Sequence, residues 1–202
     1  MVNKRWYGLF FFPVLFFICS CNESKIISSA SYYKNEKTLD SIQHTYNTLN
    51  DQSPFWLEFT DKSFNDVSIA IITDSIKYIY QFAITETRMA DTLQKYHLNI
   101  AGIKKLITQM KSIHCTWINN LAYYDNDKKK MLTYISLRPV MENLPFTNTK
   151  YFILTYFAQP QYFDGEGRLL AGRKLRKLRQ INNEIFRRIN DKVCYTVSEK
   201  FR

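Results

Sequence analysis

The sequence predicts an α+β fold, in which a mostly antiparallel sheet of about five to six strands carries two or three packed helices. Hydrophobic residues make up 46% of the 202 residues and charged residues 23%, which is typical of a globular chain. Several short apolar segments alternate with polar residues, as strands do, whereas a few others repeat their apolar residues at spacings of three and four, as helices do. Runs of strands with a few helices between them favour helices packed on one face of a sheet.

The first 20 residues have the organisation of a signal peptide. Lys4 and Arg5 precede thirteen uncharged residues, 6–18. This run is shorter than the roughly 20 apolar residues that cross a bilayer, and it has the length of a signal-peptide core, about 7–15 residues. Residues 1–20 are therefore predicted to be a signal peptide.

The sequence Ile18-Cys19-Ser20-Cys21 resembles the lipobox of bacterial lipoproteins, which is an aliphatic residue, two small residues and a cysteine. The resemblance implies cleavage after Ser20 and lipid attachment to the Cys21 thiol, because a thiolate is a strong nucleophile. Several acyl chains hold a protein on a membrane far more firmly than one chain does. We therefore expect a lipid-anchored protein of the bacterial cell envelope, and Asn22 favours the outer over the inner membrane. A plain cleaved signal peptide and a buried apolar start are the alternatives.

The rest of the chain is predicted to be a tether followed by one domain. Residues 21–35 are polar and serine-rich, which indicates a flexible tether behind the lipidated cysteine, and residues 36–202 have the length of a single α+β domain. The domain opens with a short helix that Ser53-Pro54 ends. Its apolar residues recur at spacings of three and four: Leu39, Ile42, Tyr46 and Leu49.

The middle of the domain is predicted to contain strands on either side of a second helix. Residues 66–85 fit both a helical stripe and two strands, but their Ile, Val, Thr and Tyr content favours two strands with a turn near Asp74. A helix behind an Asn99 cap follows, with its stripe at Ile100, Ile103, Ile107 and Met110. Further strands are expected at 115–124, 131–138, 150–157 and 193–201.

The last third of the domain is strongly basic. Residues 168–202 hold eleven basic and three acidic residues. A helix is predicted over 172–190 from the spacing of Leu175, Leu178, Ile185 and Ile189, with its basic residues mostly off that stripe. Five of them are candidates for contact with an anionic lipid or polymer: Arg173, Lys174, Arg176, Lys177 and Arg179. A solvated surface is the alternative.

Two cysteines remain after the predicted cleavage besides Cys21. A disulfide between Cys115 and Cys194 would close a loop of about 80 residues and add about 4 kcal/mol of stability in the chain-entropy model. Two buried free thiols are the alternative, because the sequence does not show whether their strands are neighbours.

No motif for catalysis stands out. His44, His97 and His114 lack the spacing of metal ligands, so we expect no metal site and no cofactor. The expected function is that of a membrane-anchored envelope lipoprotein, not an enzyme, which serves as a scaffold or accessory subunit of an envelope assembly and has an envelope protein as its partner. The alternatives are an extracytoplasmic ligand- or polymer-binding module, with the Asp164-Gly165-Glu166-Gly167 loop or the sheet face as its mouth, and an enzyme of another type. Nucleic acid does not fit the expected location.

Overall fold

The computed structural model describes residues 20–125, 128–138, 151–171, 177–181 and 184–198. The chain divides into two units, Met1–Lys34 and Asn35–Arg202, and the second is described below. The predicted signal peptide lies outside the described residues, apart from Ser20. Helix α1 (Ser20–Gln52) includes residues 21–35, for which the sequence predicted a flexible tether. This segment contains neither Pro nor Gly, and extending an existing helix is far easier than starting one.

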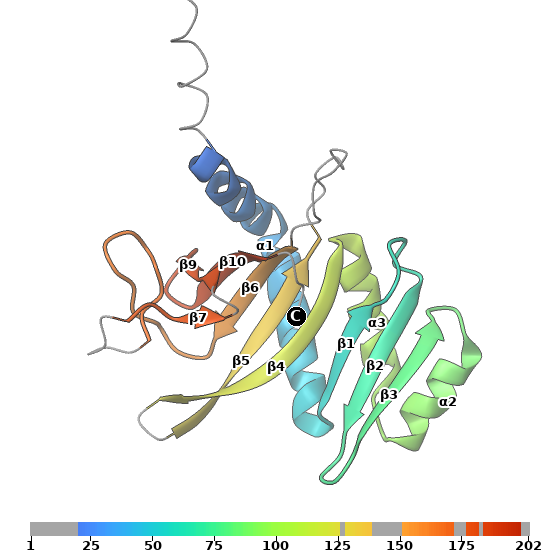
Figure 1. The fold of residues 1–202 in the computed structure, drawn as a ribbon. Coiled ribbons are helices and arrows are strands. Elements are labelled where there is room, and N and C mark those ends of the chain that lie inside the picture. Colours follow the sequence, from blue (N-terminus) through green and yellow to red (C-terminus); the bar gives the residue numbers. More distant parts are fainter. Residues whose placement is uncertain (1–19, 126–127, 139–150, 172–176, 182–183, 199–202) are drawn as a thin grey trace, which may run out of the picture. The chain divides into compact units, whose positions relative to one another are not determined.

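The described part of the second unit is built on an eight-stranded antiparallel sheet with the order β3-β2-β1-β4-β5-β6-β10-β9 (Figure 1). Its strands are β1 (Phe55–Phe59), β2 (Asp66–Ile72), β3 (Lys77–Ala83), β4 (Cys115–Asp125), β5 (Lys128–Leu137), β6 (Tyr151–Phe157), β9 (Arg187–Arg188) and β10 (Val193–Ser198). The α+β class, the antiparallel sheet and the number of helices are confirmed, but the sheet has eight strands rather than five to six. The extra strands include β1, which is buried on both faces and shows no alternation, and β9, which has only two residues.

The two predicted strands in 66–85 are confirmed as β2 and β3, joined by a turn in which the Thr73 N–H donates to the Ile76 C=O at 2.9 Å. The helix with the Asn99 cap is confirmed as α3 (Ile100–Ser112), and the Asn99 side chain accepts a hydrogen bond from the Gly102 N–H at 2.9 Å. Gly102 lets α3 and α1 approach closely, because a Cβ atom at this position would lie 2.7 Å from a methyl group of Leu49 on α1, which would have to shift. Helix α2 (Thr87–Lys95) was not among the predicted elements.

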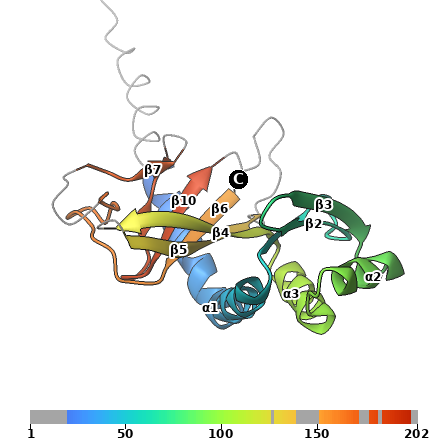
Figure 2. The same cartoon turned by 90° about the horizontal axis from the view of Figure 1, so that it is seen from below.

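The helices lie on one face of the sheet (Figure 2). On α1 the predicted apolar stripe is confirmed, since Leu39, Ile42, Tyr46 and Leu49 are all buried. Tyr46 has a second role at the seam between β1 and β4, which pair only through Leu57 with Ile118 and Glu58 with Trp117. Its hydroxyl donates to the Phe55 C=O at 2.6 Å and accepts from the Asn120 N–H at 3.1 Å. The Tyr46 hydroxyl therefore bonds to both β1 and β4, next to the few residues through which these two strands pair.

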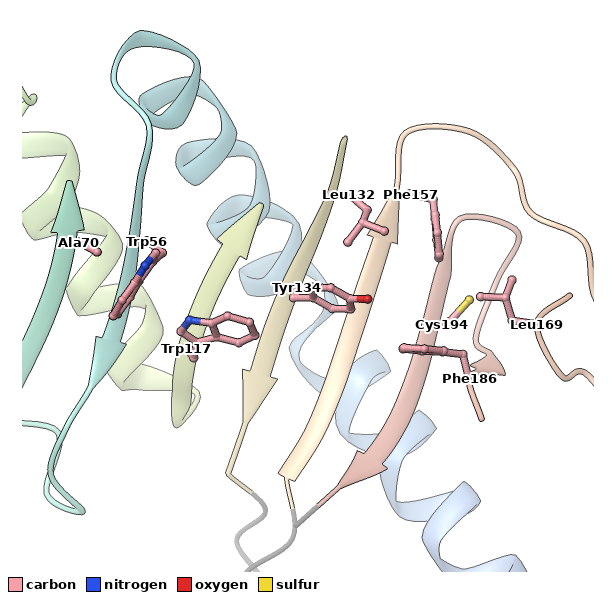
Figure 3. Packing of buried hydrophobic residues seen from close by; sticks show 9 residues of the cluster. All are labelled: Trp56, Ala70, Trp117, Leu132, Tyr134, Phe157, Leu169, Phe186 and Cys194. Carbon is pink, nitrogen blue, oxygen red and sulfur yellow. The ribbon is translucent and has the colours of Figure 1, made fainter. Parts of the chain in front are cut away.

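The opposite face carries an apolar cluster that runs across the sheet (Figure 3). Its buried members are Trp56, Ala70, Trp117, Leu132, Tyr134, Phe157, Leu169, Phe186 and Cys194. Leu169 and Phe186 belong to the segment between β6 and β10, and the Phe186 ring stacks with that of Tyr134 on β5. This part of the face is therefore closed by the chain itself.

The predicted helix at 172–190 is wrong wherever the structure describes this range. Residues 177–181 and 184–190 contain no helix, and β7 (Gln180–Ile181) pairs with β8 (Glu184–Ile185) in a small separate sheet. The backbone bonds to distant partners instead: the Arg179 N–H donates to the Leu169 C=O at 2.8 Å, and the Leu169 N–H donates to the Phe186 C=O at 2.9 Å. These non-local pairs place Phe186 on the aromatic cluster, which outweighs the local helical pattern.

Candidate interaction surface

Strand β3 forms one edge of the sheet and pairs on its inner side with β2. Antiparallel pairs alternate between bonded and non-bonded positions. On β2 and β3 the bonded positions include Thr73 with Ile76 at one end and Asn65 with Ile84 at the other. With the observed register, Tyr78 and Tyr80 then bond to β2, while the N–H and C=O groups of the residues between them point away from the sheet.

Three residues of this edge offer their backbone groups outward: Lys77, Ile79 and Gln81. These groups have no hydrogen-bond partner among the described residues. At the end of the strand the outward groups of Ala83 are closed by Glu86, whose carboxylate accepts from the Ala83 N–H at 3.3 Å and whose own N–H donates to the Ala83 C=O at 2.9 Å. The open part of the edge is therefore 77–81.

Large apolar side chains surround this open edge. We call them the β3 edge patch: Ile72, Ile76, Tyr78 and Ile79. Ile76 and Ile79 keep 53% and 57% of their surface exposed, although isoleucine is among the residues most often found buried. Adjacent exposed apolar residues of this kind mark interaction sites more often than singly scattered ones do.

A cluster of tyrosines lies beside the edge on its helix-covered side. The hydroxyls of Tyr80 on β3 and Tyr96 at the end of α2 are 2.6 Å apart, and the rings of Tyr78 and Tyr80 stack with centroids 6.5 Å apart. The hydrogen bond to Tyr80 raises the pKa of Tyr96 to about 12, so the Tyr96 hydroxyl stays protonated at neutral pH. The Lys95 ammonium lies 5.5 Å from the centre of the Tyr96 ring. The cluster thus offers rings, hydroxyl groups and a positive charge.

Of the five predicted anionic-partner residues, the structure describes Lys177 and Arg179. Arg173, Lys174 and Arg176 lie outside the described residues, and Lys177 is exposed. Arg179 is half-buried, and its guanidinium lies 5.6 Å from the ring centre of Tyr123 and 5.9 Å from that of Phe157. Arg179 therefore packs on the aromatic face of the sheet, a contact that the helical prediction missed.

Of the two alternatives left open for Cys115 and Cys194, the structure has the free thiols, and both are buried. Their strands β4 and β10 are separated by β5 and β6. Three strand spacings amount to about 14 Å, whereas bridged cysteines have Cα atoms less than about 7 Å apart. Burial raises the pKa of each thiol to about 12, so neither is activated as a nucleophile.

The loop 164–167 is a closed turn. The Asp164 carboxylate accepts the backbone N–H groups of Glu166 at 3.0 Å and Arg168 at 2.8 Å, and the Arg168 Nε–H donates to it at 2.7 Å. The hydrogen bond from the Arg168 backbone, together with that from its side chain, lowers the pKa of Asp164. This carboxylate therefore stabilises the turn in its ionised form. A general acid must carry a proton to donate, so Asp164 does not suit that role.

Cys21 lies in the first turn of α1, and the other lipobox residues up to Cys19 lie outside the described residues. In the part of the chain that the structure describes, no three His, Cys, Asp or Glu side chains are grouped as a metal site would need. No described helix is both long and apolar enough to cross a bilayer. No known protein family, curated protein or solved structure matches the chain.

Sequence reasoning missed the β3 edge patch, although one signal for it was present. Residues 76–85 alternate apolar and polar side chains, and Ile79 stands in the polar phase of that alternation. An isoleucine at such a position is either covered by another element or left exposed. The sequence does not show which, because the place of β3 at the edge depends on the whole sheet order.

Proposed function

We propose that this protein is a lipid-anchored, non-catalytic scaffold or accessory subunit of a bacterial envelope assembly, and that its domain binds a partner protein at the β3 edge patch. The anchor would be Cys21, within the sequence Ile18-Cys19-Ser20-Cys21. The partner would be another envelope protein, held next to the membrane by this chain.

The observation that carries the proposal is the exposed β3 edge patch beside open backbone groups. Ile76 and Ile79 are exposed, whereas most apolar side chains of the neighbouring strands β1 and β2 are buried. An apolar patch of this kind is unfavourable in water, and a protein partner that covers it regains the free energy of its burial. The thiols of Cys115 and Cys194 are buried and the Asp164 carboxylate is bonded within its own turn, so these groups do not support a catalytic role.

Cross-linking in intact cells tests the binding surface. A photoreactive amino acid placed at Ile79 should give one adduct of defined mass, whereas the same amino acid at the exposed Lys104 of α3 should not. Adding Ile76→Lys to the Ile79 variant should remove the adduct by disrupting the patch. Equal adducts at both positions, or none at Ile79, would contradict the proposal.

Membrane fractionation tests the anchor separately. Cys21→Ala should abolish incorporation of labelled palmitate and move the protein to the soluble fraction, while Cys19→Ala should leave both unchanged. Continued labelling of the Cys21→Ala protein would contradict lipid attachment at this residue.

A further inference from the structure

We infer that the partner binds by strand addition, so that an extended segment of the partner pairs antiparallel with β3 as a ninth strand of the sheet. This inference rests on the proposed function and names the chemistry of the partner. Lys77, Ile79 and Gln81 each direct a backbone N–H and a C=O group away from the sheet. Such a row of open groups is a template for another strand.

The length of the open edge defines the size of the segment. Residues 77–81 span about 17 Å at 3.4 Å per residue. Beyond them Glu86 closes the backbone groups of Ala83, and the turn that contains Thr73 and Ile76 closes the other end. The edge therefore accepts about five residues of an extended chain.

The size of the edge and the position of α2 favour a peptide segment over a second copy of this chain. A stable dimer needs roughly 20–30 residues on each side of its interface, far more than this edge provides. Helix α2 lies alongside β3 on the helix-covered side of the sheet (Figures 1 and 2). If two copies of the chain paired through their β3 strands, the two-fold axis between these strands would place both α2 helices on that same side of the joined sheet, beneath the two paired strands. An isolated strand brings no second helix.

The side chains of β3 specify what the segment carries. Residues that face Tyr78 and Tyr80 would contact the tyrosine cluster on the helix-covered side, and the residue that faces Ile79 would contact an exposed isoleucine on the other side. Apolar residues suit these three central positions, because cross-strand pairs of aromatic and branched residues are favourable. An acidic residue suits the position that faces Lys77, an exposed residue whose ammonium group lies 5.1 Å from the centre of the Trp56 ring. The expected segment is a short apolar strand with an acidic C-terminal end.

A library of random heptapeptides displayed on phage, selected on the full-length protein in detergent, provides the probe. Selected peptides should show consecutive apolar residues followed by an acid. In the complex, hydrogen exchange of the Ile79 and Gln81 amides should slow at least tenfold, while that of exposed amides in α3 should not change. A peptide methylated on the backbone nitrogen that faces Ile79 should bind at least tenfold more weakly.

A proline variant tests the protein's side of the pairing. Gln81→Pro removes an outward N–H without touching the hydrogen bonds to β2, and an edge strand tolerates proline at such a position. It should weaken peptide binding at least tenfold, whereas Gln81→Thr, which keeps the N–H group, should bind like the natural protein. The methylated peptide keeps the test valid if the proline variant does not fold.

The outcomes separate this inference from the proposed function. If Ile79→Lys abolishes peptide binding but Gln81→Pro and peptide methylation do not, the patch binds through side chains alone, and strand addition is wrong while the proposed function stands. If no peptide is enriched, or if sedimentation shows a dimer that Gln81→Pro dissociates, an added peptide strand is likewise overturned. If the photoreactive group at Ile79 gives no adduct in cells, the proposed function fails with it.

Discussion

The two edges of the sheet differ in length, in charge and in whether the chain covers them. At one end β9 has only two residues, Arg187 and Arg188, and the chain covers it: Arg168 bridges to Arg187, and the Arg188 N–H donates to the Gly167 C=O at 2.8 Å. Arg188 also forms an ion pair with Asp191. At the other end β3 has seven residues and is open over 77–81. A short, charged and covered edge prevents pairing with other chains, whereas a long apolar edge invites it. We therefore expect the closed edge to contribute more to stability, and the open edge is the one that we propose for interaction.

The largest effect on stability is expected from opening the closed edge. Phe186→Ala should lower the free energy of unfolding by about 3–5 kcal/mol, because it leaves a cavity beneath the C-terminal segment. Lys177→Ala, at an exposed position of the same segment, should change it by less than about 0.5 kcal/mol. Urea unfolding followed by fluorescence measures both. Equal losses would mean that the segment does not close the cluster.

The second prediction uses the two buried thiols as reporters of local opening. Cys194 lies in the same cluster as Phe186, whereas Cys115 is in β4 and outside it. Phe186→Ala should therefore raise the labelling rate of Cys194 by a thiol reagent at least tenfold, with a much smaller change at Cys115. Mass spectrometry of labelled peptides separates the two. Parallel acceleration would show that the whole sheet opens at once.

A smaller effect is expected at the Asp164 turn, which holds Arg168, the residue that bridges to Arg187 of β9. Asp164→Asn keeps an acceptor oxygen but removes the charge that meets Arg168, so it should lower the melting temperature at pH 7. The pKa of Asp164 is lowered in the folded protein, so the stability from its ionised form is present above the unfolded pKa of about 3.9. It is lost as the pH falls through the folded value. The difference between the two proteins should shrink over that acidic range and persist from pH 5 to 8.

The smallest effect on stability is expected at the open edge. Ile79→Thr should change the free energy of unfolding by less than about 0.5 kcal/mol, because its side chain is exposed and threonine also suits a strand. Ile69→Thr places the same change in the fully buried part of β2 and should cost several times more. Calorimetry of the two variants is the measurement. A large loss for Ile79→Thr would mean that this residue is part of the core.

Local patterns predicted part of the fold. The apolar stripe on α3, which has a buried and an exposed side, was recognised from its spacing. β2 and β3 were recognised from their content of Ile, Val, Thr and Tyr, because β2 is buried at its five central residues and β3 is mostly exposed. β1 is buried along its whole length, so it carries no alternation to detect. In the described part of 172–190 the error is the reverse: the spacing predicted a helix, but the backbone of 177–179 pairs with residues 169–171 instead.

The candidate site was the part least accessible from sequence. Whether Ile79 is exposed depends on β3 lying last in the sheet, and whether Cys115 meets Cys194 depends on two strands between them. Both are properties of strand order, which no short segment of the chain encodes. The Arg179 contact with Tyr123 and Phe157 likewise joins residues from three distant segments.

The seam at Tyr46 has a mechanical consequence. Strands β1 and β4 pair through so few residues that the sheet consists of a three-stranded half and a five-stranded half, joined along a weak line. The Tyr46 hydroxyl crosses this line between the Phe55 C=O and the Asn120 N–H. A force applied to β3 acts on the smaller half and reaches the larger one across this seam. Under load the sheet should part here first, and α1 is the element that resists the separation.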